Sequence, residues 1–157
     1  MPHPYLRYTL AALALLALVR PAGAENAWVA STGIRVIDLD RGDVIGRLSV
    51  AEDQVVREIR FDAAGEDAYV ASMGGLFRVE TASLAVHPPL SDRPTCSVDV
   101  AREADRLVAL HLRHSGDGLA DRERGIPTTV TLQVYERSSG TPLGAVELHG
   151  APLSVRI

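Results

Sequence analysis

The chain has 157 residues, 46% of them hydrophobic and 4% aromatic, with 16 basic residues, 20 acidic residues and a formal net charge of −4. This length and balance predict one ordinary globular domain rather than a disordered chain. All 16 basic residues are arginine, which excludes chemistry that needs a lysine amine within this chain, and the lack of a basic cluster argues against nucleic acid as a partner.

The first 24 residues have the order of a secretory signal peptide. Residues 1–9 carry Arg7 and no acidic residue, residues 10–19 are uninterrupted Ala, Leu and Val, and Ala22-Gly23-Ala24 forms a small-residue cleavage site. Ten apolar residues make a helix of about 15 Å, roughly half the hydrocarbon core of a bilayer. The sequence therefore predicts a periplasmic or secreted protein that begins at Glu25 and has no membrane span after cleavage.

The rest of the chain repeats itself. Ala27-Trp28-Val29-Ala30-Ser31 returns as Ala68-Tyr69-Val70-Ala71-Ser72, and positions 57–72 align with positions 96–111. The repeated segments are short, rich in Val and Ile, and bounded by Asp, Gly and Ser turns, which favours β-strands over helical repeats. A period of about 40 residues is typical of the four-stranded blades of a β-propeller.

The predicted fold is therefore all-β, with about three propeller blades of four antiparallel strands, labelled a (innermost) to d (outermost). The strands are expected as b-c-d over residues 28–50, a-b-c-d over 55–90, a-b-c-d over 96–148, and a lone strand a over 153–157. Residues 25–157 form the repeat domain, with a loop insertion at 113–128. Because closed propellers have about four to eight blades, three blades indicate a truncated propeller or a homo-oligomer that pools its blades.

Two expectations concern the edges of these blades. Pro88 and Pro89 fall in the second strand d, where a missing N–H is tolerable because strand d is outermost. The first and last blades lack a neighbour on one side. The apolar residues around Trp28, Val29 and Val36, and around Val130, Leu132 and Val134, are therefore expected to be partly exposed.

Several of these segments resemble a known repeat family. Val36-Ile37-Asp38-Leu39 with Gly42-Asp43-Val44, and Phe61-Asp62 with Gly65 before Tyr69-Val70-Ala71-Ser72, resemble the YVTN-type blade signature of bacterial β-propellers. Gly150-Ala151-Pro152 before Val155 is similar to the G-x-P entry to strand a in that family. The resemblance covers nearly all of residues 27–157. It implies a surface or periplasmic binding protein.

The same broad group contains propellers that resemble quinoprotein amine dehydrogenase heavy chains and the haem d1 domain of nitrite reductase. The resemblance therefore also implies a second function class, a periplasmic redox subunit. The sequence itself contains no G-x-S-x-G, H-E-x-x-H or G-x-G-x-x-G motif. A non-enzymatic scaffold for a protein or small ligand is therefore the main hypothesis.

In a propeller, the b–c and d–a connections emerge on one face, here called the top face. This face is expected to gather Arg93, His111, His114 and His149 into a ligand-binding site.

A metal site on this face is the competing hypothesis. His111 and His114 could ligate a divalent metal together with Asp117 or Asp121, but their spacing matches no known zinc pattern and a solvated loop explains it equally well. No metal and no cofactor are therefore predicted.

Other side chains are expected to pack or pair between repeats. Trp28 and Tyr69 occupy equivalent positions, which favours packing over a base-stacking or cofactor platform. Arg60 aligns with Asp99, and opposite charges at one repeat position indicate ion pairs between neighbouring blades or solvated edges.

The chain has one cysteine, Cys96, so no disulfide can form within it. Cys96 alternates with Val98 and Val100, which predicts a shared strand face and a buried, inert thiol.

Overall fold

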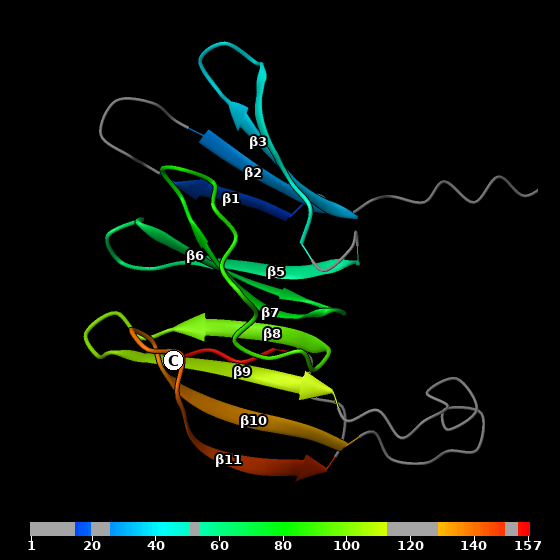
Figure 1. Cartoon of the computed structure of the whole chain (residues 1–157), viewed down its shortest axis with the longest axis vertical. Coiled ribbons are helices and arrows are strands. Elements are labelled where there is room, and N and C mark those ends of the chain that lie inside the picture. Colours follow the sequence, from blue (N-terminus) through cyan, green and yellow to red (C-terminus); the bar gives the residue numbers. More distant parts are fainter. Residues whose placement is uncertain (1–14, 20–25, 51–53, 113–128, 150–153) are drawn as a thin grey trace, which may run out of the picture.

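The computed structural model describes residues 15–19, 26–50, 54–112, 129–149 and 154–157, and every regular element in these ranges is a β-strand (Figure 1). The strands are β1 (Leu15–Val19), β2 (Asn26–Ser31), β3 (Gly33–Asp38), β4 (Val44–Leu48), β5 (Val56–Phe61), β6 (Asp67–Ser72), β7 (Gly75–Glu80), β8 (Thr95–Val100), β9 (Arg106–Leu112), β10 (Thr129–Glu136) and β11 (Pro142–His149). The predicted all-β class is confirmed.

The strands form three antiparallel sheets, each of which follows the chain order. The first sheet is β1-β2-β3-β4, the second is β5-β6-β7, and the third is β8-β9-β10-β11. Successive sheets lie one above the other along the long axis of the molecule (Figure 1). None of the sheets closes on itself.

Hairpin turns with an acidic residue and a glycine join neighbouring strands. Between β3 and β4, the Asp38 carboxylate accepts hydrogen bonds from two backbone N–H groups of the turn, and Gly42 has a φ of 73°. Between β5 and β6, Asp62 and Gly65 repeat this arrangement, and the φ of Gly65 is also 73°. A carboxylate that caps the turn, followed by a residue tolerant of positive φ, explains why the chain reverses at these two points.

Two apolar clusters hold the three sheets together. The first joins the first and second sheets and consists of Trp28, Ala30, Ile34, Val36, Leu48, Val50, Val56, Ile59, Ala68, Val70, Phe77 and Val79. The second joins the second and third sheets and consists of Tyr69, Ala71, Leu76, Val98, Val100, Leu107, Ala109 and Tyr135. Trp28 and Tyr69 are fully buried in different clusters, so the prediction that both are packing residues is confirmed.

The second sheet lacks the expected fourth strand. Residues 81–94 run alongside β7 but pair with it only at two isolated bridges, Val79 with Val86 and Leu76 with Ser91. Pro88 and Pro89 lie between these bridges and carry no N–H, so a continuous ladder cannot form there. The prolines interrupt the edge strand instead of being tolerated within it.

The connection formed by residues 81–94 also contacts the sheets on either side. Leu84, which has a φ of 59°, packs against the first cluster, and its Cδ1 occupies the space above Gly46 of β4, so a Cβ at position 46 would require this side chain to shift. Leu90 packs against the second cluster and lies close to Gly140. One irregular segment thus ties its own sheet to both neighbours.

The two ends of the described chain also differ from the prediction. β1 lies within the predicted signal peptide and pairs with β2 as the first strand of the first sheet. Residues 154–157 form no strand, so the lone strand a is not seen in this part of the chain. The predicted insertion at 113–128 lies outside the described residues.

The expectation of partly exposed apolar residues on the end sheets holds for three of the six residues named and is wrong for the other three. Val29, Leu132 and Val134 are half-buried, whereas Trp28, Val36 and Val130 are buried, with 2%, 1% and 0% of their surfaces exposed. Strand alternation turns Trp28 and Val36 towards the second sheet rather than away from it.

Candidate functional site

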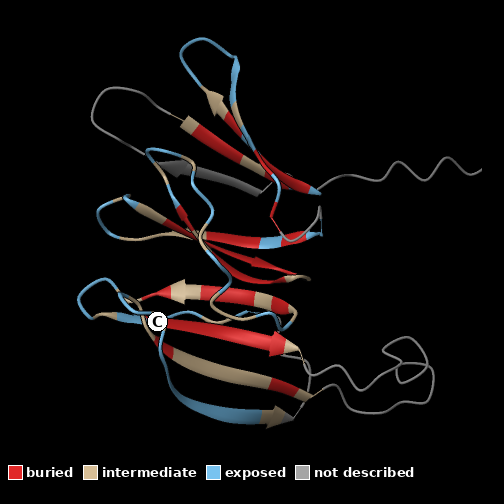
Figure 2. Ribbon diagram, in the orientation of Figure 1, coloured by how far each residue is buried: buried red, intermediate tan, exposed pale blue. Residues whose placement is uncertain are grey.

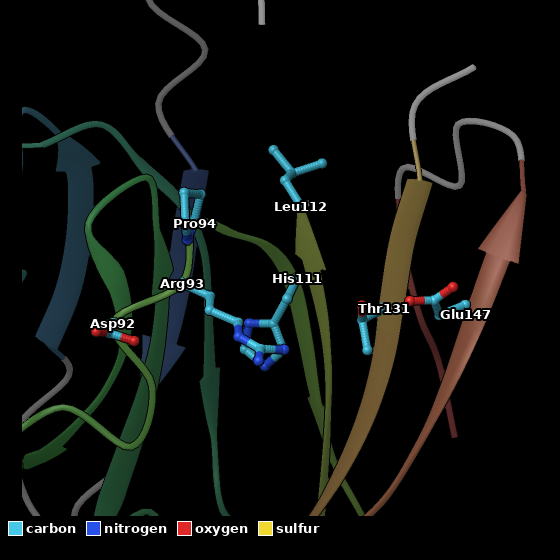
Figure 3. Close-up of a pocket in the computed structure, with 7 residues that line it drawn as sticks. All are labelled: Asp92, Arg93, Pro94, His111, Leu112, Thr131 and Glu147. Atoms are coloured by element: carbon cyan, nitrogen blue, oxygen red, sulfur yellow. The ribbon is translucent and has the colours of Figure 1, made fainter. Parts of the chain in front are cut away.

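The candidate site is an open pocket at one end of the third sheet (Figure 3). Its volume of about 500 Å³ falls within the range of small-molecule sites. The connection before β8, the ends of β9 and β10, and β11 all contribute to it. The pocket is lined by Asp92, Arg93, Pro94, His111, Leu112, Thr131 and Glu147.

The structure brings together two of the four residues predicted for this site. Arg93 and His111 both line the pocket, and Figure 3 shows their side chains next to each other. His114 lies outside the described residues. His149 is the last residue of β11, and its side chain is also outside the described part of the chain.

His111 belongs to a buried hydrogen-bond network instead of the expected loop. β9 continues to Leu112, so His111 is a strand residue, with 1% of its surface exposed. Its Nδ1 lies 2.9 Å from the Thr95 hydroxyl and its Nε2 lies 2.7 Å from the Tyr135 hydroxyl. The imidazole thereby links the innermost three strands of the third sheet.

The partners of Thr95 define which nitrogen of His111 carries the proton. The Thr95 hydroxyl donates its only hydrogen to the backbone carbonyl of Arg93. In its contact with His111 the hydroxyl oxygen must therefore accept a hydrogen bond from Nδ1. Nδ1 is therefore the protonated nitrogen, and Nε2 accepts the hydrogen bond of the Tyr135 hydroxyl.

The surroundings of His111 disfavour its charged form. The pKa of His111 is lowered to about 4, mainly because the imidazole is buried and also because the positive charge of Arg93 lies nearby. Burial also raises the pKa of Tyr135. A neutral imidazole with both nitrogens hydrogen-bonded is suited to holding the sheet together, and it is poorly suited to proton transfer near neutral pH or to metal ligation.

Arg93 is the exposed cationic group of the pocket. Its backbone is held on both sides, because its N–H donates to the Ser91 hydroxyl at 3.2 Å and its carbonyl accepts from the Thr95 hydroxyl at 2.9 Å. The guanidinium is thus presented at the pocket from a fixed backbone. Planar guanidinium groups bind carboxylates and phosphates with two parallel hydrogen bonds.

A second group of charged residues lies where the second and third sheets meet. The Glu58 carboxylate on β5 is 7% exposed and accepts hydrogen bonds from the Ser97 hydroxyl at 2.5 Å and the Val98 N–H at 3.1 Å. Its other oxygen lies 2.5 Å from Arg60 and 3.0 Å from Arg156. Glu58 therefore connects β5, β8 and residues 154–157.

The sequence predicted part of this group and missed its centre. Arg60 lies 3.6 Å from Asp99, so the predicted pairing of these two aligned residues between neighbouring repeats is confirmed. Glu58 was missed, although it stands at the position of its repeat that aligns with Ser97 in the next repeat. Because opposite charges compensate one another here, we assign this group to the packing of the sheets.

Neither a metal-ligand cluster nor a membrane-spanning helix occurs in the residues that the structure describes. Within these ranges, no group of three or more His, Cys, Asp or Glu side chains is arranged to hold a metal ion. The suggested ligands His114, Asp117 and Asp121 lie outside them. No helix in the same ranges is long and apolar enough to cross a membrane.

Cys96 sits at a β-bulge between β8 and β9, where the register shifts between Thr95 and Ser97. The bulge breaks the alternation, so Cys96 does not join the cluster that contains Val98 and Val100, and that expectation is wrong. Its thiol is half-buried and donates a hydrogen bond to the Leu110 carbonyl at 3.4 Å.

Burial raises the pKa of the Cys96 thiol, which lowers the fraction of reactive thiolate. We expect the folded chain to react with a thiol reagent at pH 8 about tenfold or more slowly than the urea-unfolded chain. Absorbance assays with an aromatic disulfide measure both rates. Equal rates in the two states would contradict the assignment of an inert thiol.

A comparison with models of protein families finds no match for this chain, and a search of curated proteins finds no similar sequence. We therefore describe this protein by its fold alone. It is an all-β chain of three stacked antiparallel sheets, and an open pocket lined by Arg93 lies at one end of the third sheet.

Proposed function

We propose that this chain is an exported, non-enzymatic scaffold of propeller-type blades that binds a carboxylate-bearing ligand at the Arg93 pocket. The sequence repeat and the stacking of three meandering sheets support the propeller-type arrangement. The signal-like order of residues 1–24 supports export. The YVTN-type resemblance is part of the same proposal.

The observation that carries the proposed binding role is the placement of Arg93. Its backbone is fixed by Ser91 and Thr95, while its guanidinium remains exposed in a pocket of about 500 Å³. Thr131 on β10 supplies a hydroxyl that can fix the orientation of a polar ligand. A non-enzymatic role is supported by His111, the only histidine lining this pocket among the described residues, because it is neutral and fully hydrogen-bonded.

The redox alternative stays a prediction without a specific observation in its favour. Both nitrogens of His111 are occupied by hydrogen bonds, so this residue does not offer an axial ligand to a haem iron. A visible absorption spectrum of the protein purified from its own cell envelope tests the alternative. A quinone or haem band would replace the scaffold proposal.

We expect Arg93→Ala to weaken the binding of short dicarboxylates and tricarboxylates about tenfold or more, since a charge-assisted bidentate contact contributes about 1.5–3 kcal/mol. Isothermal titration with succinate and citrate at low salt measures the change. Arg93→Lys should recover part of the affinity, because lysine keeps the charge but loses the planar fork.

Arg47→Ala is the matched control, because Arg47 is an exposed arginine on β4 of the first sheet and does not line the pocket. Equal affinities of the Arg93 and Arg47 variants, or no carboxylate binding by the wild-type chain, would contradict the binding proposal. Export is tested separately by N-terminal sequencing of the secreted chain, which should begin at Glu25.

A further inference from the structure

One wall of the Arg93 pocket is a row of three residues on neighbouring strands. His111 on β9 pairs with Thr131 on β10, and Thr131 pairs with Glu147 on β11. Residues directly opposite each other on antiparallel strands lie on the same face of the sheet, and all three line the pocket. The row therefore crosses the pocket from β9 to β11, the outermost strand of the third sheet.

The exposure of these residues increases along the row. His111 is 1% exposed, Thr131 is half-buried and Glu147 is exposed. Figure 2 shows the same gradient for whole strands, from buried β9 through β10 to exposed β11. The outer end of the row thus faces water, where a charged group of a ligand loses little hydration.

Opposite charges lie at the two ends of the row. Arg93 lies next to His111 at the inner end, and Glu147 lies beyond Thr131 at the outer end (Figure 3). Neighbouring strands of a sheet are about 4.8 Å apart, so two strand spacings separate the backbones of β9 and β11 by about 10 Å. A positive and a negative group therefore stand apart across the pocket, with the Thr131 hydroxyl between them.

The charge balance of the lining disfavours a ligand that is negative at both ends. The lining includes one arginine and two acidic residues, Asp92 and Glu147, and its histidine is neutral because the pKa of His111 is lowered to about 4. In Figure 3 the Asp92 carboxylate lies on the other side of Arg93 from Glu147, so Glu147 is the acid that faces a ligand bound at Arg93. A second carboxylate on that ligand would be repelled by Glu147, whereas an amine would be attracted.

We propose that Glu147 determines the specificity of the Arg93 pocket, and that the ligand is an ω-amino acid with its carboxylate at Arg93 and its ammonium group at Glu147. A carboxylate has about four lone-pair positions, so Glu147 can accept from a ligand amine alongside its other partners. An α-amino acid carries both charges on one carbon and spans the row less well. This inference rests on the proposed carboxylate-binding function and narrows the class of its ligand.

Isothermal titration of the full chain at pH 7 and low salt tests the charge preference. The probes are 5-aminopentanoate and adipate, whose two charged groups are the same number of bonds apart. We expect 5-aminopentanoate to bind about fivefold or more tightly than adipate, because one exposed contact changes from repulsion to attraction. Its isomer 2-aminopentanoate, an α-amino acid, should bind more weakly than 5-aminopentanoate.

Two substitutions of Glu147 should change this preference in a defined direction. Glu147→Gln removes the charge, so it should weaken 5-aminopentanoate, strengthen adipate and bring the two affinities within about twofold of each other. Glu147→Arg should reverse the preference, so that adipate binds more tightly. A variant that fails to fold would lose both ligands alike, so these opposite changes are specific. The matched control is Glu103→Gln, which removes an exposed acid that does not line the pocket and should keep the wild-type ratio.

Equal affinities of the wild-type chain for 5-aminopentanoate and adipate, or an unchanged ratio in Glu147→Gln, would overturn this inference. Equal binding of the two aminopentanoate isomers would overturn the placement of the ligand from end to end of the row. If Arg93→Ala still weakens adipate in those cases, the proposed carboxylate-binding function stands. If the wild-type chain binds neither probe, the proposed function is wrong and this inference with it.

Discussion

Replacing Glu58 with alanine is expected to lower the free energy of unfolding by about 2–3 kcal/mol, since the buried Ser97 hydroxyl and Val98 N–H lose a charged acceptor, while the partly exposed arginines can be hydrated. The carboxylate is 7% exposed and contacts Ser97, the Val98 N–H, Arg60 and Arg156. Without it, the edge of β8 loses its acceptor and the arginines lose their counter-charge. Urea unfolding followed by circular dichroism measures the change.

Two further variants make this result specific. Glu58→Gln keeps an oxygen acceptor for the backbone but removes the charge, so its loss should be smaller than that of Glu58→Ala. Glu103→Ala changes an exposed acidic residue in the turn between β8 and β9 and should stay within about 0.5 kcal/mol of wild type. A Glu58→Ala chain as stable as the Glu103→Ala chain would show that the cluster does not hold the sheets together.

The second large effect is a loss of stability at mildly acidic pH that depends on His111. Its pKa is about 4 in the folded chain, against an ordinary value of 6.5, so the unfolded chain binds more protons between these values. The stabilisation is complete above pH 6.5 and is lost as the pH falls towards 4. The free energy of unfolding should decrease by about 3 kcal/mol over this window from His111 alone.

Urea unfolding at pH 7 and at pH 4.5 separates this contribution from that of the carboxylates. His111→Gln should show a smaller decrease between the two pH values than the wild-type chain, because glutamine does not titrate. Tyr135→Phe removes the hydroxyl at Nε2 but leaves the imidazole, so it should cost about 1 kcal/mol and keep a decrease of the same sign. Identical decreases in the wild-type and His111→Gln chains would contradict the assigned network.

The sequence predicts the strands best where the local pattern and the final packing agree. Trp28 and Tyr69 recur at the same repeat position, and both are buried between sheets. Strand periodicity is a local property, so the repeats are sufficient to predict the all-β class and most of the strand order.

Features that depend on neighbouring sheets were not predicted correctly. The burial of Trp28 and Val36 was misjudged, because the sequence alone does not say which strand face turns towards the next sheet. The role of Pro88 and Pro89 was misjudged as well, since an edge strand with two consecutive missing N–H groups loses its ladder.

The candidate site shows the same limit. The topology argument correctly placed Arg93 and His111 near one another, but it assigned His111 to a loop. His111 is polar, and its burial depends on hydroxyl partners from Thr95 and Tyr135, which lie on the strands before and after its own. Such partners are not visible in the periodicity of a single strand, and the same holds for Glu58.

The central claim is that β8 and residues 154–157 are each held by a backbone N–H that donates to a polar side chain of the preceding repeat: Val98 to Glu58 of β5, and Val155 to Ser97 of β8. Hydrogen exchange of the Val98 and Val155 amides, measured by NMR, tests this claim most directly. Both amides should be protected in the wild-type chain, and Ser97→Ala should speed the exchange of Val155 at least tenfold while Val98 stays protected by Glu58. Exchange of Val155 at the rate of an unstructured peptide in the wild-type chain, or no response to Ser97→Ala, would contradict it.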